Sequence, residues 1–106
     1  MDQGRPEQAA TVLDQLIADQ PDFTEAWNRR AVLRYTQQDY RGAIADCQEV
    51  LARIPYHFGA LHGLGLCYAA LGNYREAIAA FRKALAVQPY ATINQRLLLE
   101  CTARLS

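Results

Sequence analysis

The chain has 106 residues, 51% of them hydrophobic, and its 11 Lys and Arg residues balance 11 Asp and Glu residues. This is one domain's length with enough apolar residues for a continuous core. The charge balance lacks the basic excess of nucleic-acid-binding proteins, and no apolar run is long enough to span a bilayer, so neither nucleic acid nor membrane is an expected partner.

The hydrophobic pattern, read from the N-terminus, predicts six helices and no strand. Apolar residues recur every three or four positions in each segment, which is typical of the buried face of a helix. Asp39 and Asn73 suit the N-caps of the third and fifth helices, and Gly72 suits the end of the fourth. A proline follows the first, third and fifth segments and stops each helix. In chain order, the predicted helices are residues 6–20, 24–37, 40–53, 58–71, 74–87 and 92–105.

The chain repeats itself. When Tyr40 is placed on Tyr74, residues of similar size fall on one another along the chain, and three prolines keep the same spacing. We call this shift along the chain, from Tyr40 to Tyr74, the repeat period. The other matches include Ala43 with Ala77, Ile44 with Ile78, Leu51 with Leu85, and Pro21 with Pro55 and Pro89. Each period therefore holds one pair of helices.

This arrangement of two helices per period resembles the tetratricopeptide repeat (TPR) family, whose period is about 34 residues. The residues that carry the resemblance in 58–91 are Leu64, Gly65, Tyr68, Gly72, Tyr74, Ala77, Phe81, Ala84 and Pro89. The resemblance implies an all-α fold, a right-handed α-solenoid of stacked antiparallel helix pairs, as a single domain over residues 1–106. We expect a fragment made of the second helix of a partial repeat (1–23), two repeats (24–57 and 58–91) and a terminal first-type or capping helix (92–106).

Two arginines stand at core positions of the 24–57 repeat. Arg30 and Arg34 lie four residues apart on one helical face, where the family usually has Leu and Tyr. An unpaired buried charge is costly, so we expect them to pair with Asp46. The alternative is that they reach the edge of the stack and bind a carboxylate of a ligand.

The sequence contains no recognisable catalytic or metal-binding motif. His57 and His62 are five residues apart, a spacing that does not stack them on one helical face, and no CxxC pair or phosphate-binding loop is present. Cys47, Cys67 and Cys101 fall within apolar helical patterns, as buried thiols do. We expect no cofactor and no enzyme activity. Reduced thiols and an N-terminus without a signal-peptide pattern favour the cytoplasm, while an export signal on a longer parent stays open.

A binding face is implied by the family resemblance. First helices of such repeats form a concave side, and the positions that face a ligand in the family fall on a mixture of small, apolar and polar residues here. Two of those positions, Gly59 and Gly63, carry glycine inside a helix, which favours close approach by a ligand or, alternatively, by residues 92–105. The candidate peptide-binding residues are Asn28, Arg29, Val32, Tyr35, His62, Gly63, Leu66, Ala70 and Arg96.

Two functions follow from these patterns. The first is a non-catalytic module that binds a peptide segment or helix of a protein partner on its concave face. The alternative is a structural element that self-associates, or docks onto the rest of a larger protein, through an exposed end of the stack. Helix 6–20 should leave an apolar face open, and the last helix is rich in leucine, with Leu97, Leu98, Leu99 and Leu105. We therefore expect a homo-oligomer formed through an end helix.

Overall fold

The computed structural model describes residues 5–105; residues 1–4 and 106, at the outer ends of the first and last predicted segments, lie outside the described range. Within that range there are helices and no strands, which confirms the all-α prediction. Each observed boundary agrees with its predicted boundary to within one residue. The helices are α1 (Pro6–Asp19), α2 (Thr24–Thr36), α3 (Tyr40–Arg53), α4 (Phe58–Ala70), α5 (Tyr74–Val87) and α6 (Thr92–Arg104).

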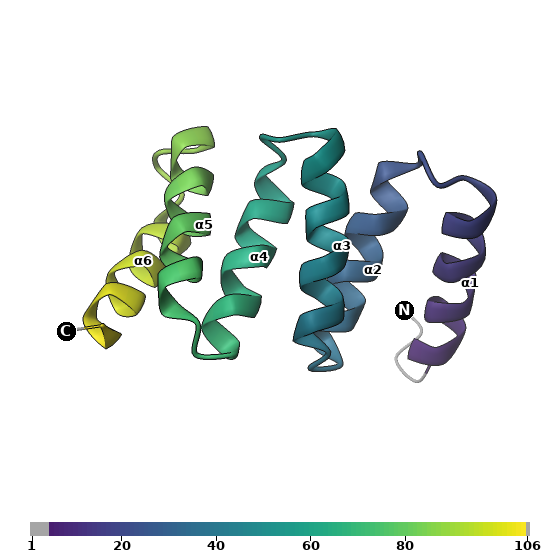
Figure 1. The fold of residues 1–106 in the computed structure, drawn as a ribbon, viewed down its shortest axis with the longest axis horizontal. Helices are drawn as coiled ribbons and strands as arrows, with labels where there is room; N and C mark the ends of the chain where they lie inside the picture. Colours follow the sequence, from purple (N-terminus) through teal and green to yellow (C-terminus); the bar gives the residue numbers. More distant parts are fainter. Residues whose placement is uncertain (1–4, 106) are drawn as a thin grey trace.

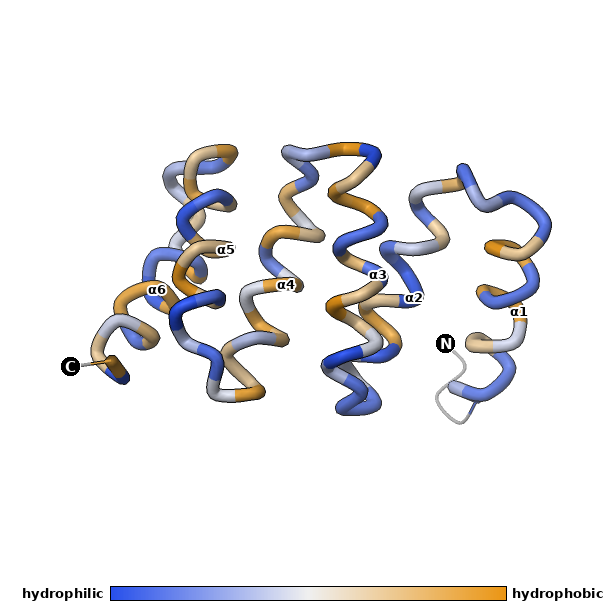
Figure 2. The backbone as a smooth tube through the Cα atoms, viewed as in Figure 1, coloured by the Kyte–Doolittle hydropathy of each residue, from blue (hydrophilic) through white to orange (hydrophobic). Residues whose placement is uncertain are grey.

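The helices stand side by side in chain order along the longest of three dimensions, 43 × 27 × 23 Å (Figure 1). Each helix packs on its neighbour in the chain, and α2 also contacts α4. Every helix carries both hydrophobic and hydrophilic residues, and neither kind is confined to one part of the stack (Figure 2). The stack is therefore held together mainly by contacts between neighbouring helices, and α1 and α6 form its two ends.

The helix ends show which of the predicted capping residues form capping hydrogen bonds. Asp39 caps α3 by accepting a hydrogen bond from the backbone N–H of Gly42, as predicted. Asn73 stands at the N-cap of α5, but its side chain makes no capping bond. His57 caps α4 instead with an imidazole nitrogen, Nδ1, which accepts from the N–H of Ala60. Gly72 has a φ of 79°, the left-handed conformation that glycine adopts without strain at a helix end.

The core contains two clusters, one between α2, α3 and α4 and the other between α4, α5 and α6. Ala31, Cys47 and Val50 belong to the first cluster. Phe81 anchors the second, and its ring lies directly on the backbone of α4: a Cβ added at Gly65 would be 2.5 Å from its Cε1. Small residues on one helix and large ones on the next therefore set the helix spacing in this stack.

A buried ion pair joins α2 to α3, which confirms the expected role of the two arginines. Asp46 is 1% exposed and accepts bonds from Arg30 Nε and Nη2 (3.0 and 2.9 Å) and from Arg34 Nη1 (3.1 Å). Arg30 Nη1 also donates to Asp14 of α1 at 2.9 Å, and the guanidinium lies 5.1 Å from the ring centre of Trp27. The bond to Asp46 raises the pKa of Arg30. One side chain thus links three helices, and it is not available to a ligand.

Candidate functional site

A hollow of about 240 Å³ lies between α2 and α4, the two first helices of the repeats. Six of the nine predicted site residues line it. Its lining is Asn28, Ala31, Val32, Tyr35, Cys47, Gly59, His62, Gly63, Leu66 and Cys67. Most of these side chains are apolar, so the hollow suits one apolar group surrounded by a few polar ones.

The hollow exists because of side-chain size. Cys47 of α3 stands at the repeat position that Phe81 holds in α5, and a thiol fills much less space than a phenyl ring. A Cβ built at Gly63 would meet only Cys47 Sγ, at 3.4 Å, and one at Gly59 would meet His57 and Asn28. None of these nearest atoms belongs to α6, so residues 92–105 do not pack on the two glycines, although Asn94 of α6 contacts His62 of the same helix.

Three polar side chains surround the hollow. Among the described residues, the side-chain amide of Asn28 and the hydroxyl of Tyr35 have no hydrogen-bond partner. His62 Nδ1 contacts Asn94 Oδ1 of α6, and its ring stacks on Phe58 with 6.2 Å between ring centres. In this orientation of the carboxamide, His62 Nδ1 donates to Asn94 Oδ1, and Nε2 is the remaining polar atom of the ring.

Two thiols line the deep side of this hollow. Cys47 and Cys67 are 2% and 1% exposed. Burial raises the pKa of Cys47 to about 12, with further contributions from Cys67 and Asp46, and burial raises the pKa of Cys67 to about 11. Both thiols therefore stay protonated near neutral pH and act as small apolar groups there, not as nucleophiles.

Sequence reasoning missed part of this lining. Ala31 and Cys67 lie on the predicted first helices but were not among the predicted site residues, and Cys47 comes from α3, a second helix. The signal that could have identified Cys47 is its comparison with Phe81: the shorter side chain leaves unfilled volume beside the neighbouring first helix.

The three remaining predicted residues lie outside the hollow. Ala70 is exposed on the last turn of α4. Arg96 is on α6, where it forms an exposed ion pair with Glu100 at 3.8 Å. Arg29 faces a second groove and pairs with Glu25 at 3.1 Å.

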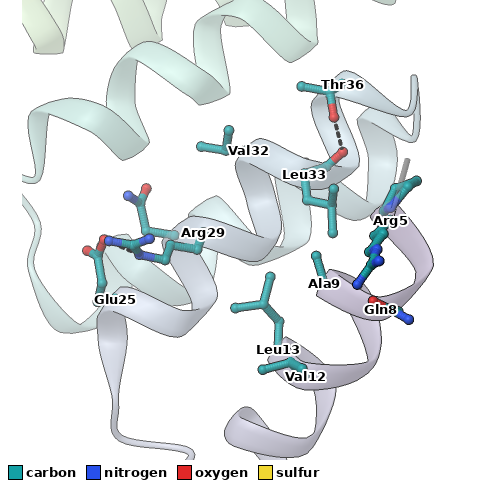
Figure 3. Close-up of a pocket in the computed structure, with 12 residues that line it drawn as sticks. Arg5, Gln8, Ala9, Val12, Leu13, Glu25, Arg29, Val32, Leu33 and Thr36 are labelled. Carbon is teal, nitrogen blue, oxygen red and sulfur yellow. Dashed lines mark hydrogen bonds and ion pairs between the residues drawn. The ribbon is translucent and has the colours of Figure 1, made fainter. Parts of the chain in front are cut away.

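This second groove lies between α1 and α2 and has a volume of about 940 Å³. Ala9, Val12 and Leu13 of α1 and Leu33 of α2 gather in the space between the two helices, with Glu25 and Arg29 together at one side (Figure 3). Val12 is 63% exposed, so the groove leaves apolar surface open to solvent. We call it the α1/α2 groove.

Residues 5–105 lack features of two other kinds. They contain no group of three or more His, Cys, Asp or Glu side chains placed to hold a metal ion. None of the helices described is long and apolar enough to cross a membrane.

Comparison with known proteins finds the same repeat. Residues 22–89 match the family model described as tetratricopeptide repeat. A TPR repeat-containing protein of Rhizobium etli is 38% identical over 81 residues, which cover 76% of this chain and 40% of that protein. An FK506-binding protein-like protein of Mus musculus is 47% identical over 47 residues, covering 44% of this chain and 14% of its own length.

Solved structures show the same fold at lower identity. MamA residues 41 to the end from Desulfovibrio magneticus RS-1 superpose with a TM-score of 0.90 at 24% identity, covering 97% of this chain and 58% of that one. MamA AMB-1 gives 0.90 at 23% identity, covering 98% and 57%. The chain thus spans less than two thirds of the length of each of these proteins, and the structural likeness concerns the fold.

Proposed function

The chain belongs to the tetratricopeptide repeat family, whose members bind protein partners, and we propose that it is a non-catalytic module that binds a peptide through the α2/α4 hollow. The hollow itself is the observation that carries this proposal. At about 240 Å³ it is smaller than most sites for whole small molecules, which start near about 300 Å³, and it suits a single apolar side chain.

The polar groups around the hollow support an extended peptide as the ligand. A peptide segment carries N–H and C=O groups at regular intervals, and these need partners once an apolar side chain is buried. Asn28 offers both a donor and an acceptor, the Tyr35 hydroxyl offers both, and His62 Nε2 adds a further polar atom. Ala70 and Arg96 extend the proposed face along α4 and α6 beyond the hollow, and Arg29 extends it toward α1.

The test is a selection of displayed random peptides on the whole chain, followed by fluorescence anisotropy with an enriched peptide. Gly63→Leu fills the hollow and Tyr35→Ala removes one polar group, so we expect each to weaken binding by about tenfold or more. Arg82→Ala, on the exposed side of α5, is the matched control and should bind like the parent chain. Enriched peptides that bind Gly63→Leu as tightly as the parent, or a selection that enriches none, would contradict the proposal.

We propose a second function, assembly through an end of the stack, because both ends carry exposed apolar side chains. Leu99 of α6 and Leu105, directly after that helix, are 70% and 46% exposed, and Val12 of α1 is 63% exposed. Soluble single domains rarely gather such side chains without a partner. Sedimentation velocity over a wide concentration range tests this function: we expect association, and a monomer at every concentration would contradict it.

A further inference from the structure

The two ends of the stack correspond to the two halves of one repeat. α1 has the place of a second helix, because Ala9 falls one repeat period before Ala43 of α3. In residues 5–105, no first helix covers its inner face. α6 has the place of a first helix, because Thr92 falls one repeat period after Phe58 of α4. No second helix in the described range follows it.

We propose that α6 of one copy docks in the α1/α2 groove of a second copy of this chain, in the position and direction of a first helix. This inference rests on the second proposed function and deepens it by naming the partner and the register. We call this contact between α6 of one copy and the α1/α2 groove of the next the joint. It would complete a repeat from α6 of one copy and α1 of the next.

The lining of the groove supports this register. The residues that α3 and α4 contribute to the hollow have equivalents one repeat period earlier, and these all line the α1/α2 groove. They are Leu13, Glu25, Asn28, Arg29, Val32 and Leu33, in place of Cys47, Gly59, His62, Gly63, Leu66 and Cys67. The groove is therefore the same junction with one wall removed, which accounts for its larger volume. In the joint, Arg96, Leu99, Glu100 and Ala103 of α6 supply that wall, at the positions of Asn28, Ala31, Val32 and Tyr35.

Charge is complementary in this register. A Cβ at Gly59 would lie 3.9 Å from Asn28 Oδ1, so these two repeat positions are neighbours. In the joint they carry Glu25 of the receiving copy and Arg96 of the docking copy. One helical turn further along both helices, the same relation brings Arg29 beside Glu100. The joint therefore forms two ion pairs of opposite polarity.

Both arginines already have partners of opposite charge, but only within their own helices. The Arg29–Glu25 pair is 3.1 Å long, the Arg96–Glu100 pair is 3.8 Å long, and all four side chains are at least 46% exposed. Such exposed pairs contribute little to the stability of a single copy. Docking would combine the two pairs into one network of four charges without any change in the helices.

The apolar positions also match. The ion pair of Arg30 with Asp46 has Leu98 and Val12 as its equivalents in the joint, so both charged partners are replaced by aliphatic ones. Leu99 would face Leu13 where Gly65 faces Phe81 in the second repeat. Two leucines need more room than a glycine and a phenyl ring, so α6 and α1 would stand further apart than α4 and α5. The joint is therefore weaker than an internal repeat and reversible.

An interface of this kind joins two different surfaces and leaves one copy of each surface free. Continued in the direction of the stack, such contacts add further copies and do not stop at a closed pair. Sedimentation of the whole chain should therefore show a weight-average mass that keeps rising with concentration beyond that of a dimer.

The decisive test exchanges charges within each helix. One variant carries Glu25→Arg with Arg29→Glu, and the other carries Arg96→Glu with Glu100→Arg. Each exchange keeps the net charge and the pairing within its helix, so we expect only a small effect on folding, which urea unfolding of each variant checks. Either exchange alone places like charges together in the joint and should weaken association by about tenfold or more. The chain with all four substitutions should regain the association of the parent.

The possible outcomes distinguish failure of this inference from failure of the second proposed function. A monomer at every concentration overturns both. Association that is unchanged by either exchange, that is not restored in the fourfold variant, or that stops at a dimer overturns the register and leaves assembly through an end standing. Tyr90→Ser is the control for non-specific apolar contact, because Tyr90 is 90% exposed in the turn before α6, outside the joint. If it weakens association as much as the exchanges do, the proposed joint is wrong.

Discussion

Two glycines in one turn of α4 should respond to alanine in opposite ways. Both Gly63 and Gly65 lie inside the helix, where alanine is favoured over glycine by about 1 kcal/mol because its backbone has less freedom to lose. The surroundings of the new methyl group decide the outcome. At Gly63 it would meet Cys47 Sγ at 3.4 Å, an ordinary contact, so the full gain should be kept and Gly63→Ala should stabilise the fold by about 0.5–1 kcal/mol.

At Gly65 the methyl group would lie 2.5 Å from Phe81 Cε1 and 2.7 Å from Cδ1 and Cζ. Phe81 is 0% exposed and belongs to the second core cluster, so its ring cannot move without displacing its neighbours. Overpacking of this kind costs about 1–3 kcal/mol, and the severe contact places Gly65→Ala at the upper end. After subtraction of the helix gain, we expect a net loss of about 2 kcal/mol.

Urea unfolding followed by circular dichroism measures both variants against the parent chain. The midpoint should rise for Gly63→Ala and fall for Gly65→Ala with an unchanged slope. The comparison needs no outside reference, because the two sites share a helix, a residue type and a substitution. Equal shifts of the two midpoints, in either direction, would refute the assignment of Gly65 as a packing position and of Gly63 as the wall of a hollow.

Two further predictions concern the buried charge and the buried thiols. Asp46→Ala leaves Arg30 and Arg34 without their shared partner and should lower the free energy of unfolding by about 3 kcal/mol, as measured in urea. The triple variant Arg30→Leu, Arg34→Tyr, Asp46→Ala carries the residues of the next repeat and should recover most of this loss. Failure to recover it would contradict the equivalence of the repeats. The pKa of Cys47 is about 12 in the folded chain against an ordinary 9.0, so the unfolded chain loses this proton first and stability should fall as the pH rises from about 9 to 12. Cys47→Ala should make that fall shallower, and an identical pH profile would show that the thiol is not responsible.

The sequence predicted the fold closely because its signals are local. Prolines after the second helices and Gly72 after α4 mark helix ends through backbone geometry alone, and the repeat period then fixes which helices are neighbours. Asp46 could be assigned to Arg30 and Arg34 for the same reason: an unpaired charge inside a stack of known register has few places to find a partner.

The site was less predictable, because it depends on differences between repeats rather than on their common pattern. The family resemblance located the exposed positions of α2 and α4, but the depth of the hollow comes from the small side chain of Cys47 on α3. The contact of His62 with Asn94 joins residues 32 positions apart on different helices, and no local pattern encodes it. The cap on α4 was missed because His57 is not among the residue types that commonly cap helices.

Asn94 has a consequence for the order in which the stack opens. It is 1% exposed at a position where the other two first helices carry Ala26 and Ala60, and its Nδ2 has no partner among the described residues. Whichever way the carboxamide is turned, one of its polar atoms stays unpaired, at a cost of about 1–3 kcal/mol. This cost falls on an end helix that has one neighbour in the chain. Its amide hydrogens should therefore exchange through partial unfolding of α6 alone, while α3, α4 and α5 exchange only when the whole stack unfolds.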